Sequence, residues 1–101
     1  MRPRISWMNR GPDDAILELL DETDMVLTPK VMAFQIDYDY TYLRQRLGVL
    51  KEHGLIAHPV ETPSGVSQSG VYEITPLGRR YLNGEATREE LETVAEADDA
   101  V

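Results

Sequence analysis

The sequence predicts an α+β fold that is mostly helical, with a three-helix core, a hairpin of two or three strands and additional helices near the C-terminus. Three observations support this prediction. Three helix-start signals precede apolar stretches, a stripe of leucines marks a central helix, and a segment rich in Pro, Gly and Ser separates two strand-like stretches. A chain of 101 residues suits a single domain with one core.

The first helix is expected to run from Pro12 to about Thr23. Proline fits the first helical position, where no backbone N–H is needed. Asp13 and Asp14 follow at the positive end of the helix dipole, and we interpret them as solvated acids rather than a catalytic pair. The apolar stretch at residues 25–27 is compatible with a short strand.

A second, short helix is expected after Thr28, whose hydroxyl can cap it, with Pro29 in the first position. It should end near Ile36. Only the segment from Asp37 to Asp39 separates it from the next helix, which is the spacing of a helix-turn-helix. The larger apolar residues of this helix are assigned to the core: Val31, Met32, Phe34 and Ile36.

The central helix is expected from about Asp39 to His53. Leucines at i, i+4 and i+7 form a stripe that can be buried against neighbouring helices: Leu43, Leu47 and Leu50. Asp39 can cap the first turn, and Gly54 is the residue type that ends a helix in the left-handed conformation. Thr41, Gln45 and Gly48 lie opposite the stripe.

A hairpin and two more helices are expected next. Residues 56–60 can pair with residues 71–74, and the intervening ETPSGVSQSG is typical of a long loop. Thr75 and Pro76 start a helix whose apolar residues should pack inward: Leu77, Tyr81 and Leu82. Thr87 and Glu90 form a capping box, so a last helix should run to about Ala97, followed by a disordered ADDAV.

The chain divides into an N-terminal arm at 1–10, a domain at 11–85, and a C-terminal helix with an acidic tail at 86–101. The arm carries three arginines around Trp7: Arg2, Arg4 and Arg10. Two interpretations stay open. The arm is either a frayed terminus with Trp7 against the core, or an arginine arm that reaches a DNA groove.

Charge is distributed unevenly along the chain. The net charge of −8 argues against a nucleic-acid partner, but residues 1–82 hold 11 acidic and 9 basic side chains, whereas residues 83–101 hold 7 and 1. The domain itself is therefore close to neutral. Two lysines beside eighteen acids, Lys30 and Lys51, are typical of proteins adapted to a cytoplasm of very high salt, so we expect a halophilic protein.

Several kinds of site are not expected. The chain has no cysteine, no apolar run of membrane-spanning length and no signal peptide, which predicts a soluble cytoplasmic protein without disulfides. His53 and His58 are the only histidines and have no metal-ligand spacing. No catalytic constellation, nucleotide loop or cofactor pocket is recognisable, so neither enzyme activity nor a cofactor is predicted.

Two stretches carry a family resemblance. LRQRLGVLKEHGLI resembles the recognition helix and following strand of MarR-like and related winged-helix regulators, and VYEITPLGRRYLNGE resembles the second wing strand and fourth helix of the same group. The resemblance covers roughly residues 12–85 and is closest to short haloarchaeal proteins that resemble a phage repressor. It implies a winged helix-turn-helix fold and a sequence-specific DNA-binding transcriptional regulator, most simply a homodimeric repressor.

The resemblance also implies which side chains face double-stranded DNA. The family places the recognition helix in the major groove, which assigns DNA contacts to Tyr40, Thr41, Tyr42, Arg44, Gln45 and Arg46. Arg44 can contact guanine, Gln45 adenine, and the methyl group of Thr41 thymine. Arg46 lies nearer the leucine stripe, so pairing with an acid is an alternative for it.

A different class of function is also compatible with this helix. Tyrosines occupy positions where the family usually has cations, and the loop between the expected strands has no cation. A face formed by Tyr38, Tyr40 and Tyr42 is also typical of a protein-binding surface. The alternative is therefore a winged-helix interaction module that has lost strong DNA binding.

Overall fold

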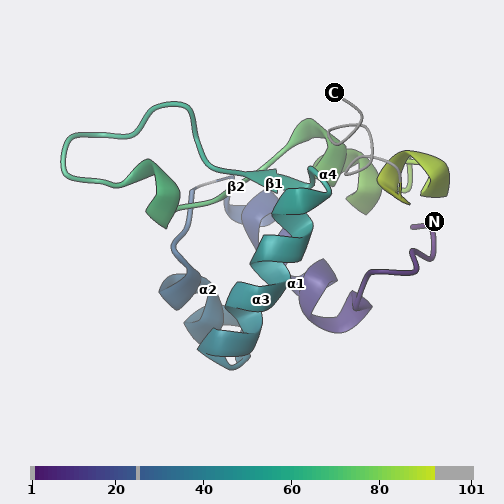
Figure 1. The fold of residues 1–101 in the computed structure, drawn as a ribbon, viewed down its shortest axis with the longest axis horizontal. Coiled ribbons are helices and arrows are strands. Elements are labelled where there is room, and N and C mark those ends of the chain that lie inside the picture. Colours follow the sequence, from purple (N-terminus) through teal and green to yellow (C-terminus); the bar gives the residue numbers. More distant parts are fainter. Residues whose placement is uncertain (1, 25, 93–101) are drawn as a thin grey trace.

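The computed structural model describes residues 2–24 and 26–92 (Figure 1). Its elements are α1 (Arg10–Thr23), α2 (Pro29–Ile36), α3 (Tyr40–Glu52), β1 (Ile56–Ala57), the 3₁₀ turn η1 (Gln68–Gly70), β2 (Glu73–Ile74) and α4 (Pro76–Leu82). The fold is therefore mostly helical with a small antiparallel sheet, which confirms the α+β class. Within the described ranges, no helix is long and apolar enough to cross a membrane.

Helix α3 crosses the front of the molecule in Figure 1, and α1 is the element that contacts most of the others. Helix α1 packs against α2, α3 and α4, and α3 also contacts α2 and β1. The long loop between β1 and β2 projects to one side, while the N-terminal segment lies on the opposite side (Figure 1). The two sides of α3 are consequently flanked by different parts of the chain.

Three of the four named α-helices begin as the sequence predicts. The side chains of Thr28, Asp39 and Thr75 each accept a hydrogen bond from the backbone N–H three residues later, at 3.2, 3.1 and 3.1 Å. These bonds satisfy donors that a helix start leaves without an intrahelical partner. At the other end of α3, Gly54 adopts a positive φ of 81°, as predicted for a residue that ends a helix.

Helix α1 begins earlier than predicted. Arg10 is its first residue, so Pro12 occupies the third position and not the first. The cap residue Asn9 makes no capping bond with its side chain, but its backbone N–H donates to the Asp13 carboxylate at 3.0 Å. Proline is tolerated at position three because N–H groups of the first turn need no intrahelical acceptor.

The core confirms the leucine stripe of α3, because all three leucines have no exposed surface. The other apolar side chains that are essentially fully buried come from α1, α2, the start of β1, α4 and the turn of helix after Thr87: Ile16, Leu17, Leu20, Met32, Leu55, Ile56, Tyr81 and Leu91. Ile5, from the N-terminal segment, is also only 3% exposed. The segment before α1 therefore belongs to the packed body of the molecule.

The assignment of four α2 residues to the core was partly wrong. Met32 is buried and Ile36 packs against the core, but Val31 is 43% and Phe34 is 83% exposed. A helix of eight residues makes only about two turns, so one narrow stripe can face the core. Met32 and Ile36 are spaced i, i+4 and take that stripe, which leaves Phe34 in solvent.

The sheet is shorter than the sequence predicts. Ile56 pairs with Ile74 and Ala57 with Glu73, and the ladder ends there. Pro59 supplies no N–H, and His58 uses its Nδ1 to donate to the Val71 carbonyl at 3.0 Å. The predicted stub before α2 does pair, because Leu27 and Tyr72 exchange two backbone hydrogen bonds of 2.9 Å.

The capping box after α4 forms as predicted. The Thr87 N–H donates to Glu90 Oε1 and the Glu90 N–H donates to Thr87 Oγ1, both at 3.1 Å. Residues 88–92 are helical. The predicted continuation to Ala97 and the predicted disorder of ADDAV concern positions outside the described residues.

Candidate nucleic-acid interface

The solvent side of α3 carries most of the predicted DNA-contacting residues. Thr41, Arg44 and Gln45 are exposed, and Tyr40 is 39% exposed. The Arg44 guanidinium lies over the Tyr40 ring, 5.8 Å from its centroid. A Cβ added at Gly48 would meet nothing within 4 Å, so this part of the helix surface is open to a partner. These side chains face outward because the leucines on the other side are buried.

Tyr42 lies differently from its neighbours. It is half-buried, its hydroxyl accepts a hydrogen bond from the Asn9 amide at 2.5 Å, and its ring lies 6.3 Å from that of Tyr38. Tyr38 is half-buried as well. Of the three tyrosines around the start of α3, only Tyr40 is therefore substantially exposed.

Arg46 is bound within the protein. Its Nε and Nη2 donate to the two Asp13 carboxylate oxygens at 2.9 and 2.7 Å, and Nη2 also donates to the Trp7 carbonyl at 3.1 Å. The Asp13 side chain is 0% and that of Arg46 16% exposed. Hydrogen bonding to Asp13 raises the pKa of Arg46, so this guanidinium stays charged.

The interpretation of Asp13 and Asp14 as solvated acids was wrong. Asp13 is buried beneath Arg46, and Asp14 accepts hydrogen bonds from the Tyr81 hydroxyl at 2.6 Å and from Arg2 at 3.2 Å. Burial and the hydrogen bond to Asp14 raise the pKa of Tyr81. Both acids join the start of α1 to distant parts of the chain.

Most of the ten basic side chains are neutralised within the protein. Those in ion pairs are Arg2, Arg10, Arg46, Arg79, Arg80 and Arg88. Within residues 2–24 and 26–92, no ion pair is formed by the remaining four: Arg4, Lys30, Arg44 and Lys51. Few cations are therefore free to bind an anionic partner, and their positions indicate where such a partner could bind.

Two of these four cations line one cleft. Lys30, in the first turn of α2, and Arg44, on α3, border a pocket of about 280 Å³. Its other lining residues come from the starts of α2 and α3 and from the end of the long loop: Thr28, Pro29, Tyr40, Ser69, Gly70 and Tyr72. Cations beside hydroxyl groups are a combination suited to phosphate oxygens. Sequence reasoning missed Lys30, although the Thr28-Pro29 start places it in the first turn.

The loop between β1 and β2 presents a different surface. Residues 59–70 contain no Lys or Arg, and Val60 is 87% and Val66 41% exposed. Its polar side chains are used internally, since Thr62 donates to the Val66 carbonyl at 2.6 Å and Gln68 donates to the Val60 carbonyl. The loop thus offers apolar and hydroxyl groups, but no positive charge.

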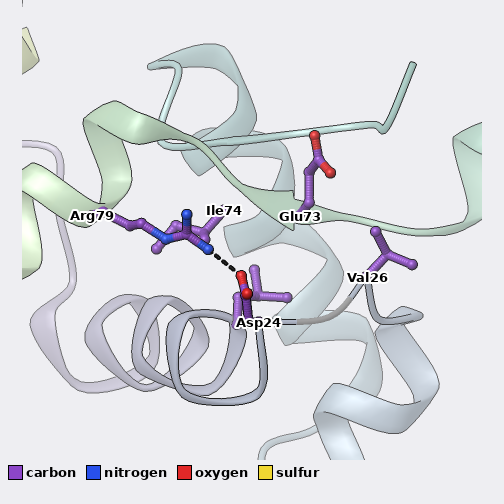
Figure 2. A pocket seen from close by; sticks show the side chains of 6 residues that line it. Asp24, Val26, Glu73, Ile74 and Arg79 are labelled. Atoms are coloured by element: carbon purple, nitrogen blue, oxygen red, sulfur yellow. Dashed lines mark hydrogen bonds and ion pairs between the residues drawn. The ribbon is translucent and has the colours of Figure 1, made fainter. Parts of the chain in front are cut away.

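A second pocket lies beside α4 and is shown in Figure 2. It has a volume of about 290 Å³ and is lined by Leu20, Asp24, Val26, Glu73, Ile74 and Arg79. Arg79 points across it and binds Asp24 (Figure 2). It also donates to Asp21 at 3.1 Å. The cation of this pocket is neutralised by neighbouring acids, in contrast with the cleft between α2 and α3.

The two histidines take part in ring stacking. The Trp7 and His53 rings are nearly parallel, with centroids 3.9 Å apart, and His53 Nδ1 lies 3.0 Å from the Val49 carbonyl. His58 and Tyr72 are 4.6 Å apart. Among the described residues, no group of three His, Cys, Asp or Glu side chains is placed to hold a metal ion.

Comparison with known proteins gives one match. A family model described as winged helix-turn-helix phage repressor matches residues 1–94. No curated protein and no solved structure matches the chain.

Proposed function

The chain belongs to the winged helix-turn-helix phage repressor family, and we propose that it is a sequence-specific DNA-binding repressor that contacts the major groove with α3. In this proposal the loop between β1 and β2 is the wing. The coarse assignment as a DNA-binding regulator follows from the family. The repressor role, the groove and the contacting residues are the proposal.

The cleft between α2 and α3 is the observation that carries this proposal. It gathers two of the four cations that form no ion pair in the described part of the chain, and the exposed side of α3 adjoins it. A phosphate contact from Lys30 would fix the position of α3 on the duplex, since backbone contacts set register without carrying sequence information, and it would leave the neighbouring Arg44 to reach a base edge. An acidic protein can bind DNA locally where its few free cations converge.

Base contacts are proposed for the exposed α3 side chains beside the cleft. The Gln45 amide suits adenine, the Arg44 guanidinium suits guanine, and the Thr41 methyl group suits thymine. Tyr40 and Tyr42 are assigned to the edge of the contact. Arg46 is left out of the set, because its Nε and Nη2 already donate to the buried Asp13 carboxylate and to the Trp7 carbonyl.

We further propose that the repressor binds as a homodimer in a cytoplasm of high salt. Two symmetry-related half-sites give a small module enough affinity, and the N-terminal segment and the C-terminal residues are the candidate dimer surfaces. Affinity from phosphate contacts falls by roughly 0.9 log unit per contact for each tenfold rise in salt. A wing without cations would lose little affinity at high salt.

The interaction-module alternative has less support. It depends on a tyrosine face, but Tyr38 and Tyr42 are half-buried, and the Tyr42 hydroxyl already binds Asn9. Tyr40 alone makes a small surface compared with the aromatic-rich core of a typical protein interface. We therefore propose DNA as the partner.

The test is selection from a random duplex library followed by footprinting, at low and high salt. The proposal expects one enriched site. Arg44→Ala and Gln45→Ala should relax the preference at separate base pairs, each by about 1–3 kcal/mol of discrimination. Arg80→Ala, which removes a cation from α4, is the control and should keep the preference. If no sequence is enriched over background, the proposal is wrong.

A further inference from the structure

We propose that residues 5–9, named here the N-terminal brace, orient α3 for DNA binding without touching DNA themselves. This inference rests on the proposed function. It assigns a positioning role to Trp7 and Asn9, and it replaces the idea of an arginine arm that enters a groove.

The brace contacts α3 at its start, middle and end. At the start, the Asn9 amide donates to the Tyr42 hydroxyl at 2.5 Å. In the middle, Arg46 donates to the Trp7 carbonyl at 3.1 Å. Beyond the last turn, the Trp7 ring stacks on His53 at 3.9 Å with an interplanar angle of 15°. A short segment therefore spans the whole length of the helix.

These contacts all fall on one side of α3. Tyr42, Arg46 and His53 are spaced i, i+4 and i+11, which places them along a single stripe. The proposed base contacts at Thr41, Arg44 and Gln45 lie on a different side. The brace can therefore hold the helix while leaving the DNA-facing side free.

The brace is itself fixed to the protein body. Ile5 is 3% exposed, and the Asn9 N–H donates to Asp13 at 3.0 Å, the acid that also binds Arg46. The buried Asp13–Arg46 ion pair thus joins α1 to α3, and the brace forms a hydrogen bond with each of its two members. A rotation of α3 would break these bonds and would move Arg44 relative to Lys30 on α2, so the proposed phosphate contact of Lys30 and base contact of Arg44 would no longer fit the same duplex.

The Trp7 ring is held by packing. Among the described residues its Nε1 is buried with no hydrogen-bond partner. Phenylalanine lacks this donor but keeps a stacking surface for His53, so Trp7→Phe should preserve the brace. Asn9→Ala is a second clean variant, because the Asn9 side chain makes no capping bond to α1.

The test compares four variants in binding to the selected duplex across a range of salt concentrations. Trp7→Ala and Asn9→Ala should each weaken binding by roughly three- to tenfold, the size of one lost hydrogen bond or stacking contact. The salt slope should stay unchanged, because no phosphate contact is lost. Trp7→Phe should bind nearly as the wild type does. Thr23→Ala is the matched control, since it removes one side-chain hydrogen bond, to the Leu19 carbonyl at 2.9 Å, at the far end of α1 from the brace.

Hydrogen exchange of the free protein supplies a readout that needs no DNA. Amides of α3 should exchange faster in Trp7→Ala and Asn9→Ala, while those of α4 keep the wild-type rate. The inference is overturned if α3 exchange is unchanged, if both variants bind with full affinity, or if the salt slope falls, which would mean that the segment contacts phosphate. Failure of the wild type to bind any duplex would refute the proposed function. In that case the hydrogen-exchange rates of the α3 amides would still show whether the brace holds α3.

Discussion

Helix α3 and the loop between β1 and β2 are the two surfaces that a winged-helix protein can present to DNA, and they are built differently here. The helix is held by the leucine stripe on one side and by the N-terminal brace on another, and it borders a cleft with two free cations. The loop is closed by its own hydrogen bonds and has no Lys or Arg at residues 59–70. In the proposed complex, ionic contacts to DNA would therefore concentrate at α3 and α2.

The largest effect is expected from the buried ion pair that fixes α3. Asp13→Ala should lower the free energy of unfolding by about 3–5 kcal/mol, because it leaves the Arg46 guanidinium largely buried without its counter-charge. Chemical denaturation measures this. Asp21→Ala is the control, because its ion pair with Arg79 is half-exposed and should contribute less than about 1 kcal/mol. Equal losses in the two variants would show that Asp13 does not fix α3.

The cleft gives the next largest effect. Lys30→Ala should weaken DNA binding about tenfold and reduce the salt slope by about one unit, since one phosphate contact is lost. Lys51→Ala removes the same kind of unpaired cation from the last turn of α3, outside the cleft, and should leave the slope unchanged. Titrations at several salt concentrations distinguish the two. The cleft is not the ionic contact if both variants behave alike.

Gly48 allows the solvent side of α3 to be tested for two properties at once. Gly48→Ala should raise the free energy of unfolding by up to about 1 kcal/mol, because alanine favours a helix interior and a Cβ there meets nothing within 4 Å. The same change should weaken DNA binding, because the new methyl group would stand between the helix and the duplex. Thermal unfolding and binding assays measure the two effects. A variant that is more stable and binds equally well would place DNA elsewhere.

A cation added to the loop tests the other half of the comparison. Ser64 is exposed beside Gly65, whose φ of 88° marks the turn of the loop. Ser64→Lys should tighten binding several-fold and steepen the salt slope by at most about one unit, if the loop lies along the backbone. Glu61→Gln is a companion change that removes the only acid of residues 59–70 without adding a cation. An unchanged slope in Ser64→Lys would show that the loop tip does not reach phosphate.

The smallest effect concerns the attachment of the brace to residue 92. The hydroxyl and backbone N–H of Ser6 lower the pKa of the Glu92 carboxyl. Because the pKa of Glu92 is lower in the folded state, its ionisation stabilises the fold at pH values above the unfolded-state pKa, which is near the ordinary value of 4.5. This stabilisation is lost as the pH falls through the folded-state pKa. The Tm of Ser6→Ala should therefore lie slightly below that of the wild type at neutral pH and converge with it in acid. A difference that grows in acid would contradict this assignment.

Local signals predicted the helices well. The caps at Thr28, Asp39 and Thr75 and the leucine stripe of α3 depend on residues within a few positions of one another, so the sequence specifies them directly. Helix α2 was harder, because a helix of two turns has apolar residues on more than one side and periodicity alone does not say which side is buried. Phe34 is exposed for this reason.

Contacts between distant residues were not predictable in the same way. Asp13 and Arg46 are 33 positions apart, and no spacing rule connects an acid in the first turn of one helix with a cation in the middle of another. The cleft is likewise assembled from the starts of α2 and α3 and from Ser69. Lys30 lines a cleft only because these three segments meet in the fold, so the residues next to it in the sequence did not predict its proposed role.

The placement of two free cations, Lys30 and Arg44, in one cleft of a protein with a net charge of −8 also has a kinetic consequence. Before contact, the net negative charge of the protein repels a duplex within roughly one screening length, whereas at contact the cleft attracts phosphate. The screening length is about 10 Å at 0.1 M salt and about 3 Å at 1 M. Added salt should therefore speed the encounter with DNA while shortening the lifetime of the complex, so the association and dissociation rates would both rise.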